Sequence, residues 1–442
     1  MSWKHSWSES AAWARALPGR VAGRLRRDLV DNRSFSMRRY GSILRAWLRG
    51  FGRPPLDGRP VVVFHKVYAK HREYNQAAAL RSTGRYQTVL FAQYFDFEEM
   101  EGAFDEVHFC ANPGAFVRQL SALARRASIH SVLCGTQTVD YAQRAMDTPR
   151  DWPVLINQYD SAWATDHLKR APRDFGEYLP ASEIAAEKDA FPRCDGVIGR
   201  FRALNILFEE QDVRTPLITR WDLCDRRRFA PIESRPPSPD GALSVVVAGL
   251  VWPMNLPEDV YGEGQLVRYA ADFQAERVHL HVYPSPYLPF HCPQYEKENR
   301  ENPFFHLHAS VPASQSPTAI AAYDLGWMVA DCSRSALFSD RSVGAIIPLR
   351  FFGLLEAGLP IVCAENMASV ADLVRKYDCG VVLPRPSPLG LRKLLEAQDF
   401  SALRSGVARA REALETLNHV DDFVAFLEEV RERWSSSHRS VS

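Results

Sequence analysis

Two titratable side chains lie where strand-like runs in the first half of the chain come to an end. His65 follows the β-branched run at 60–64, and Asp160 is the last residue of another run at 153–160. A histidine or aspartate at the carboxyl end of a strand can act as a general base that takes a proton from a hydroxyl group. His65 could equally be a satisfied histidine of the core, and Asp160 could simply cap the next turn. Both are our candidate catalytic residues.

A short helix with a charge at each end is predicted in the second half. Pro348 and the apolar run after it start this helix, and Gly358 and Pro360 end it. Arg350 then lies in the first turn and Glu356 in the last, where each charge opposes the helix dipole at a cost of about 0.3–1 kcal/mol. A diphosphate bound at the helix N-terminus would make Arg350 favourable instead. The alternative is a surface arginine and a solvated glutamate.

Two His-x-His pairs could present imidazoles to a metal ion, because residues two apart on a strand share a face. They are His279 with His281 and His306 with His308. No nearby Cys, Asp or Glu at a suitable spacing completes a four-ligand site, so we expect no metal centre. The sequence has no GxxxxGK loop, no GxGxxG after either first strand and no GxSxG elbow. This disfavours an ATP enzyme, an NAD enzyme and a serine hydrolase.

The composition is that of a globular protein. The 442 residues are 46% hydrophobic and 24% charged, which excludes a disordered chain, a coiled coil and a collagen-like repeat. Lys and Arg number 54 against 53 Asp and Glu, so the net charge predicts no nucleic-acid partner. No apolar run approaches the roughly 18 residues of a membrane-spanning helix, and the N-terminus lacks a secretory signal. Eight scattered cysteines without a CxxC pair indicate reduced thiols, so we expect a cytoplasmic protein.

The N-terminal segment is strongly basic. Residues 1–60 contain 12 Arg and one Lys against four acidic residues, a net charge of +9, which leaves −8 on the rest of a chain whose total is +1. Apolar residues between Met37 and Phe51 recur at steps of three and four, as on one face of a helix, and arginines lie off that stripe. We expect residues 1–56 to lie on an anionic membrane surface. The alternative is a helix that packs on the body of the protein.

The rest of the chain alternates strand-like and helix-length segments, which indicates βαβ units and parallel sheets. The stretch from Pro231 to Gly241, with four Pro and two Ser, is the clearest linker. We therefore expect an α/β protein with two Rossmann-like domains that face each other across a ligand cleft. The predicted strands are 60–64, 86–92, 106–110, 131–135, 153–160 and 194–199 before the linker, and 243–249, 277–283, 304–309, 323–329, 359–364 and 379–384 after it.

The second half resembles the C-terminal domain of GT-B fold glycosyltransferases. The resemblance is carried by YDLGWMV (323–329), PLRFFGLLEAGLPIVC (348–363), ASVADLVRKYDCGVVLP (368–384) and the strand that ends in VVVAG at Gly249. The stretch from DGVIGRF (195–201) to RRRFAP (226–231) resembles the end of the N-terminal domain. After the basic segment at 1–58, the resemblance implies an acceptor domain at 59–232, a nucleotide-sugar domain at 241–400, and terminal helices at 401–434 that cross back to the N-terminal domain.

The resemblance also implies a function and a site. We expect transfer of a sugar, with a UDP- or GDP-sugar as donor, to a lipid-linked or carbohydrate acceptor at the inner face of the plasma membrane. The implied donor-binding residues are Gly249, His308, Ser310, Arg350 and Glu356. The acceptor domain would supply the base, His65 or Asp160. The diphosphate charge would be met by Arg350 and a helix N-terminus, so no further cofactor is expected.

The chain departs from the family at two positions. Many retaining members carry two glutamates eight residues apart around this helix, the second of which holds the nucleotide ribose. The matching residues here are Ala345 and Gly353. Two alternatives therefore stay open: a GT-B-like binding or scaffold protein without transfer activity, and a sugar-nucleotide epimerase of the same fold.

Overall fold

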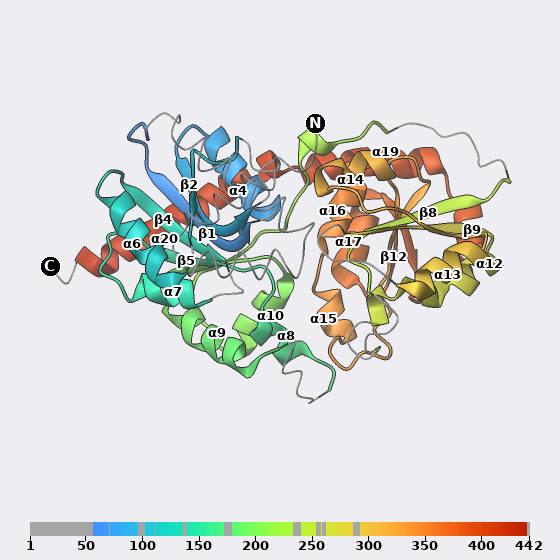
Figure 1. Ribbon diagram of the computed structural model, residues 1–442, viewed down its shortest axis with the longest axis horizontal. Helices are drawn as coiled ribbons and strands as arrows, with labels where there is room; N and C mark the ends of the chain where they lie inside the picture. Colours follow the sequence, from blue (N-terminus) through green and yellow to red (C-terminus); the bar gives the residue numbers. More distant parts are fainter. Residues whose placement is uncertain are drawn as a thin grey trace, which may run out of the picture.

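The computed structural model describes residues 56–69, 71–95, 102–110, 112–135, 139–171, 179–232, 240–252, 258, 262–285 and 292–439. It contains two α/β domains that lie side by side (Figure 1). The amphipathic stripe expected between Met37 and Phe51 lies outside the described residues, as do residues 233–239 of the linker.

The N-terminal domain is built on a seven-stranded sheet in the order β3-β2-β1-β4-β5-β6-β7, with every neighbouring pair parallel. The strands are β1 (Val61–Ala69), β2 (Gln87–Phe95), β3 (Glu106–Phe109), β4 (Ile129–Gly135), β5 (Val154–Asn157), β6 (Gly196–Gly199) and β7 (Leu217–Thr219). The helices are α4 (His71–Ser82), α6 (Pro113–Ala124), α7 (Val139–Met146), α8 (Ala162–Leu168), α9 (Ala181–Arg193) and α10 (Arg202–Glu210).

The C-terminal domain has a six-stranded parallel sheet in the order β10-β9-β8-β11-β12-β13. The strands are β8 (Leu243–Gly249), β9 (Val278–Pro284), β10 (Phe305–Leu307), β11 (Leu325–Met328), β12 (Ile361–Ala364) and β13 (Gly380–Leu383). The helices are α12 (Ala270–Ala275), α13 (Pro293–Glu301), α14 (Ser316–Ile320), α15 (Asp340–Gly344), α16 (Leu349–Glu356), α17 (Ala368–Tyr377) and α18 (Leu391–Glu396).

Two terminal helices follow, α19 (Phe400–Ala413) and α20 (Val420–Arg439). α19 packs on the C-terminal domain, where Val407 and Ala410 are buried in its core. α20 instead lies along the N-terminal domain (Figure 1), and its Phe423, Leu427 and Val430 are buried beside residues of β1 and β2. The described part of the chain therefore begins and ends in the same domain, and this holds the two domains together.

Two sequence expectations about element ends were wrong. β1 does not end before His65 but continues to Ala69, so His65 lies inside the strand. β5 stops at Asn157, three residues before Asp160, because Ser161 caps α8 and the chain has already left the sheet. At the C-terminal end, α20 continues past the buried Trp434 to Arg439.

None of the helices within the described residues is long and apolar enough to cross a membrane.

Candidate functional site

The first turn of α16 lies against the glycine turn that ends β8. Arg350 donates a hydrogen bond from Nε to the carbonyl oxygen of Ala248 at 3.0 Å and another from Nη2 to that of Leu250 at 2.6 Å. Gly249, between those two carbonyls, has a φ of +119°, a conformation that side chains rarely adopt. The structure thus brings together two of the predicted donor-site residues, Gly249 and Arg350, from elements a hundred residues apart.

The charge of Arg350 is not balanced by a carboxylate anywhere in the described part of the chain. Burial lowers its pKa to about 10, with only Tyr295 acting to raise it. Pro348 precedes α16, and no side chain caps the helix N-terminus. A half-buried guanidinium beside uncapped backbone N–H groups is an arrangement that favours a bound anion.

The exposed side of α16 is a narrow stripe. Leu349, Arg350 and Gly353 are half-buried, whereas every other residue of the helix is buried. Gly353 lies three residues after Arg350, which places the two on one face of the helix. A Cβ atom built on Gly353 would meet nothing within 4 Å, so the space above this position is open.

Glu356, at the other end of α16, is fully buried and faces the N-terminal domain. Its Oε2 lies 3.2 Å from Nε of Arg228, and its Oε1 accepts a hydrogen bond of 2.9 Å from the backbone N–H of Asp225. His71, the first residue of α4, lies 3.8 Å from Oε1. Burial raises the pKa of Glu356 to about 7. Its carboxyl group is therefore engaged between the domains and lies away from the open stripe.

His308 lies two strands from Gly249, at the far edge of the sheet. Its ring stacks on Tyr283 at 4.3 Å, and its Nε2 is 2.9 Å from Nδ1 of His281. The other pair, His279 and His306, makes the same contact at 2.9 Å. Each imidazole pair thus shares a single N–H···N hydrogen bond. Ser310 is exposed beyond β10 and has no role in this stack.

His65 is buried between Tyr141, on which its ring stacks at 3.9 Å, and Phe116. Neither ring nitrogen has a hydrogen-bond partner among the described residues. Burial, together with the charge of Lys66, lowers the pKa of His65 to about 3. With 1% of its surface exposed, His65 is placed in the core and not at the rim of the sheet.

Asp160, in contrast, is exposed just beyond the carboxyl end of β5. Its Oδ1 lies 3.5 Å from Nη1 of Arg200, which follows β6. Arg200 in turn pairs with buried Asp222 at 2.6 Å and lies over the ring of Tyr159, 4.1 Å from the ring centre. Asp160 is therefore held at the strand-end edge of the N-terminal sheet while its carboxylate remains accessible.

Solved structures of other proteins share this two-domain arrangement. The crystal structure of HepE from Anabaena in complex with UDP-glucose matches with a TM-score of 0.53 at 12% identity, over 85% of this chain and 99% of that one. Sucrose-phosphate synthase from Thermosynechococcus elongatus matches with a TM-score of 0.55 at 10% identity, over 86% of this chain and 100% of that one. The fold is GT-B.

HepE in complex with UDP gives a similar match, with a TM-score of 0.54 at 14% identity over 86% of this chain and 100% of that one. No protein-family model and no curated protein matches the sequence. At these identities the comparison establishes the GT-B fold, and function has to be argued from the site.

A buried polar network that sequence reasoning missed lies within the N-terminal domain, next to the contact with the C-terminal domain. Arg72 of α4 donates hydrogen bonds to Oδ1 of Asn157 at 3.3 Å and to the carbonyl oxygen of Arg220 at 2.7 Å, and lies 3.4 Å from Asp222. The same helix contributes His71 to the cluster around Glu356. The signal was present in the sequence, because the run HREYNQ (71–76) is polar and yet all six residues are buried.

The connection between β11 and α15 also bridges the domains. The connection includes Ser333, Arg334 and Ser335, and Arg341 follows in α15. In the structure the backbone oxygen of Ser333 accepts a hydrogen bond of 2.6 Å from Arg170 of the N-terminal domain, and Arg341 pairs with Glu210 of α10. The connection and α15 therefore both contact the other domain, and these two contacts form part of the domain interface.

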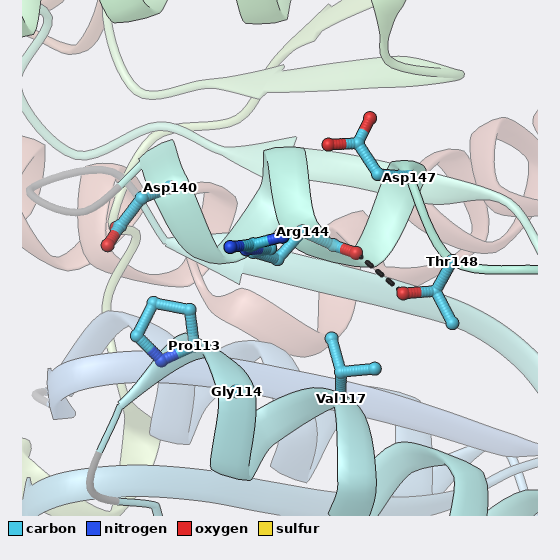
Figure 2. Close-up of a pocket in the computed structure, with 7 residues that line it drawn as sticks. All are labelled: Pro113, Gly114, Val117, Asp140, Arg144, Asp147 and Thr148. Atoms are coloured by element: carbon cyan, nitrogen blue, oxygen red, sulfur yellow. Dashed lines mark hydrogen bonds between the residues drawn. The ribbon is translucent and has the colours of Figure 1, made fainter.

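An open groove of about 540 Å³ lies between α6 and α7 of the N-terminal domain (Figure 2). Figure 2 shows Arg144 of α7 between Asp140 and Asp147, opposite the start of α6. Burial raises the pKa of Asp140, and Asp147 pairs with Arg193 at 2.6 Å. No residue singled out in the sequence lines this groove, which is formed by Pro113, Gly114, Val117, Asp140, Arg144, Asp147 and Thr148.

Proposed function

We propose that this GT-B protein is a glycosyltransferase that moves a sugar from a nucleotide-diphosphate sugar to an acceptor hydroxyl group. The observation that carries the proposal is Arg350, a half-buried cation without a carboxylate partner in the described residues, at the uncapped N-terminus of α16 and against the Gly249 turn. An anionic leaving group would supply the missing negative charge. HepE, which shares the fold, was crystallised with UDP-glucose and with UDP, which supports a nucleotide sugar as the donor.

In the proposed reaction the bond between the anomeric carbon and the diphosphate oxygen breaks, and a bond from that carbon to the acceptor oxygen forms. Negative charge grows on the diphosphate, where Arg350 and the first N–H groups of α16 would stabilise it. The acceptor proton has to leave. Asp160 is the residue we propose to take it, because it is exposed at the strand-end edge of the N-terminal domain, whereas His65 is buried.

The first test is a thermal-shift panel with UDP, GDP, TDP, CMP and their common sugars. A ligand at 100 times its dissociation constant stabilises a protein by about 2.7 kcal/mol, which gives a measurable rise in melting temperature. We expect one nucleotide class to raise the melting temperature of the wild type and to have no such effect on Arg350→Ala.

Arg392→Ala is the matched control, because Arg392 is a surface arginine of the same domain that pairs with Glu396 one helical turn away. It should keep the full ligand-induced shift. If no nucleotide stabilises the wild type, the transferase proposal fails and a binding protein is favoured. Turnover of the donor sugar without any acceptor would instead indicate an epimerase.

We further propose that the acceptor is membrane-associated and that residues 1–56 hold the protein at an anionic membrane surface. Support comes from the sequence alone, because residues 1–60 carry a charge of +9. Removing residues 1–56 should release the protein from vesicles that contain anionic lipid, and raising the salt concentration should do the same to the full chain. Equal sedimentation of both chains with such vesicles would refute the proposal.

A further inference from the structure

The Gly249 turn is held by two side chains that come from different helices. Arg350 of α16 donates to the carbonyl oxygens of the residues before and after Gly249, at 3.0 and 2.6 Å. Further along the turn, the carbonyl oxygen of Trp252 accepts a hydrogen bond of 3.0 Å from the hydroxyl group of Tyr295, in the first turn of α13. One short stretch of backbone therefore connects Arg350 to Tyr295.

The hydroxyl group of Tyr295 contacts three backbone groups. It donates to the carbonyl oxygen of Trp252, accepts a hydrogen bond of 2.7 Å from the N–H of Leu266, and lies 3.4 Å from the carbonyl oxygen of Gly264. The side chain is fully buried, and burial raises the pKa of this hydroxyl group, so it keeps its proton and remains a donor. Its removal would take a partner from buried backbone groups, which is costly.

Trp252 is fixed against the same segment by two further contacts. Its N–H donates to the carbonyl oxygen of Gly264 at 3.0 Å. A Cβ atom built on Gly264 would lie only 2.4 Å from Cδ1 of Trp252, so the indole ring packs directly on this glycine. Gly249 itself restricts the backbone less than other residues would, so the position of the turn depends on these outside contacts.

The Gly249 turn in turn sets the orientation of Arg350. A guanidinium group is planar and rigid, so two hydrogen bonds from Nε and Nη2 fix the direction of its remaining N–H groups. Those remaining groups are the donors that an incoming diphosphate would meet. A displacement of the turn would therefore rotate the donors of Arg350 away from the anion.

We propose that Tyr295 is a positioning residue of the donor site: its hydroxyl group holds the Gly249 turn, and the turn aligns the guanidinium of Arg350 with the diphosphate. This inference rests on the proposed function, because it concerns the same bound nucleotide. A hydroxyl group that only satisfied buried backbone groups would affect the stability of the fold and leave the affinity for the nucleotide unchanged.

The test is a double-mutant cycle on UDP binding, measured by calorimetric titration of the full chain, with GDP in place of UDP if the thermal-shift panel selects it. Tyr295→Phe removes only the hydroxyl group, and we expect it to raise the dissociation constant about tenfold. Arg350→Lys should bind more weakly than the wild type, because it keeps the charge and loses the planar group that the turn aligns. Adding Tyr295→Phe to Arg350→Lys should then change the dissociation constant by less than about twofold.

Tyr86→Phe is the matched control. Tyr86 is also a buried tyrosine, and its hydroxyl group donates to Glu428 within the N-terminal domain. This variant should lower the melting temperature and leave the dissociation constant of UDP unchanged. Gly264→Ala moves Trp252 without altering the hydroxyl group, so it tests the turn even if Tyr295→Phe fails to fold. It should also weaken UDP binding in the presence of Arg350 and not in Arg350→Lys.

Two results would overturn the inference. A folded Tyr295→Phe chain that binds UDP as tightly as the wild type, or in its place a Gly264→Ala chain that does so, would show that the turn does not position Arg350. An effect of Tyr295→Phe that is as large in Arg350→Lys as in the wild type would mean that Tyr295 acts by another route. A wild type that binds neither UDP nor GDP is a different result, since it refutes the proposed function itself.

Discussion

Arg350 and Glu356 are six residues apart on one helix and have opposite surroundings. Arg350 is half-buried and donates to two backbone carbonyl groups, with no carboxylate partner in the described residues. Glu356 is fully buried and lies beside Arg228 and His71, yet burial still dominates and raises its pKa to about 7. The cation therefore has capacity for an external anion, whereas the carboxylate is a structural group of the domain interface.

The raised pKa of Glu356 predicts a pH-dependent stability. The pKa of this carboxyl group is about 7 in the folded chain and 4.5 where it makes no contacts, as in the unfolded chain. The folded chain therefore binds the proton more tightly than the unfolded chain does. The contribution of protonated Glu356 to the free energy of unfolding is fully present below pH 4.5 and is lost as the pH rises through 7. At 1.36 kcal/mol per pKa unit the loss is on the order of 3 kcal/mol. Relative to Glu356→Gln, the wild type should therefore lose stability between pH 5 and pH 8.

The measurement is the free energy of unfolding of both chains at several pH values. The difference between them isolates residue 356, because Glu356→Gln retains the other titrating groups that face it, namely His71, Arg228, Asp225 and Cys224. A difference that instead grows in favour of the wild type as the pH rises would mean that the ion pair with Arg228 outweighs the cost of burial.

At this scale the sequence was informative about Arg350 and misleading about His65. The position of Arg350 follows from local signals, Pro348 before the helix and Gly358 after it, and the structure places it in the first turn of α16. His65 was assigned to a rim because the β-branched run ends at Phe64. The strand in fact continues through Lys66, whose long side chain crosses above Gly135 of β4, where a Cβ would lie only 2.3 Å from it. The side chain of Lys66 therefore has room only because residue 135, about seventy positions away, is a glycine.

At the scale of elements, the alternation of strands and helices was sufficient to predict both sheets. Each predicted strand of the C-terminal domain corresponds to an observed one, and β8 has the predicted bounds of 243–249. The three-residue strand β7 (Leu217–Thr219) was not predicted, because so short a run lacks periodicity. The polar start of α4 was also missed, since its burial depends on partners in β5 and in the chain between the domains.

One helix, α16, contributes both to the candidate donor site and to the domain interface. Its first turn contacts the Gly249 turn, and its last residue contacts α4 and the chain at Asp225 and Arg228. This short helix therefore carries both the cation of the candidate donor site and a carboxyl group of the domain interface.

At the scale of the whole molecule, two contacts between the domains can be described. One contact is the polar cluster around Glu356. The other is formed by α15 and the connection before it, which contact α8 and α10 in the lower part of the molecule in Figure 1. There Leu337 is fully buried with Ala162 and Leu179, and the hydroxyl of Ser339 donates to the carbonyl oxygen of Leu168 at 2.8 Å.

Leu337 is the apolar centre of that second contact, so its truncation should loosen the domains and leave each of them folded. A buried Leu→Ala change costs about 2–5 kcal/mol, and here most of that loss falls on the interface. We expect Leu337→Ala to increase the radius of gyration measured by small-angle scattering. Leu391→Ala is the control, since Leu391 is equally buried but lies within the C-terminal core. It should lower the melting temperature without expansion, and an unchanged radius for Leu337→Ala would show that the Glu356 cluster and α20 suffice to hold the domains.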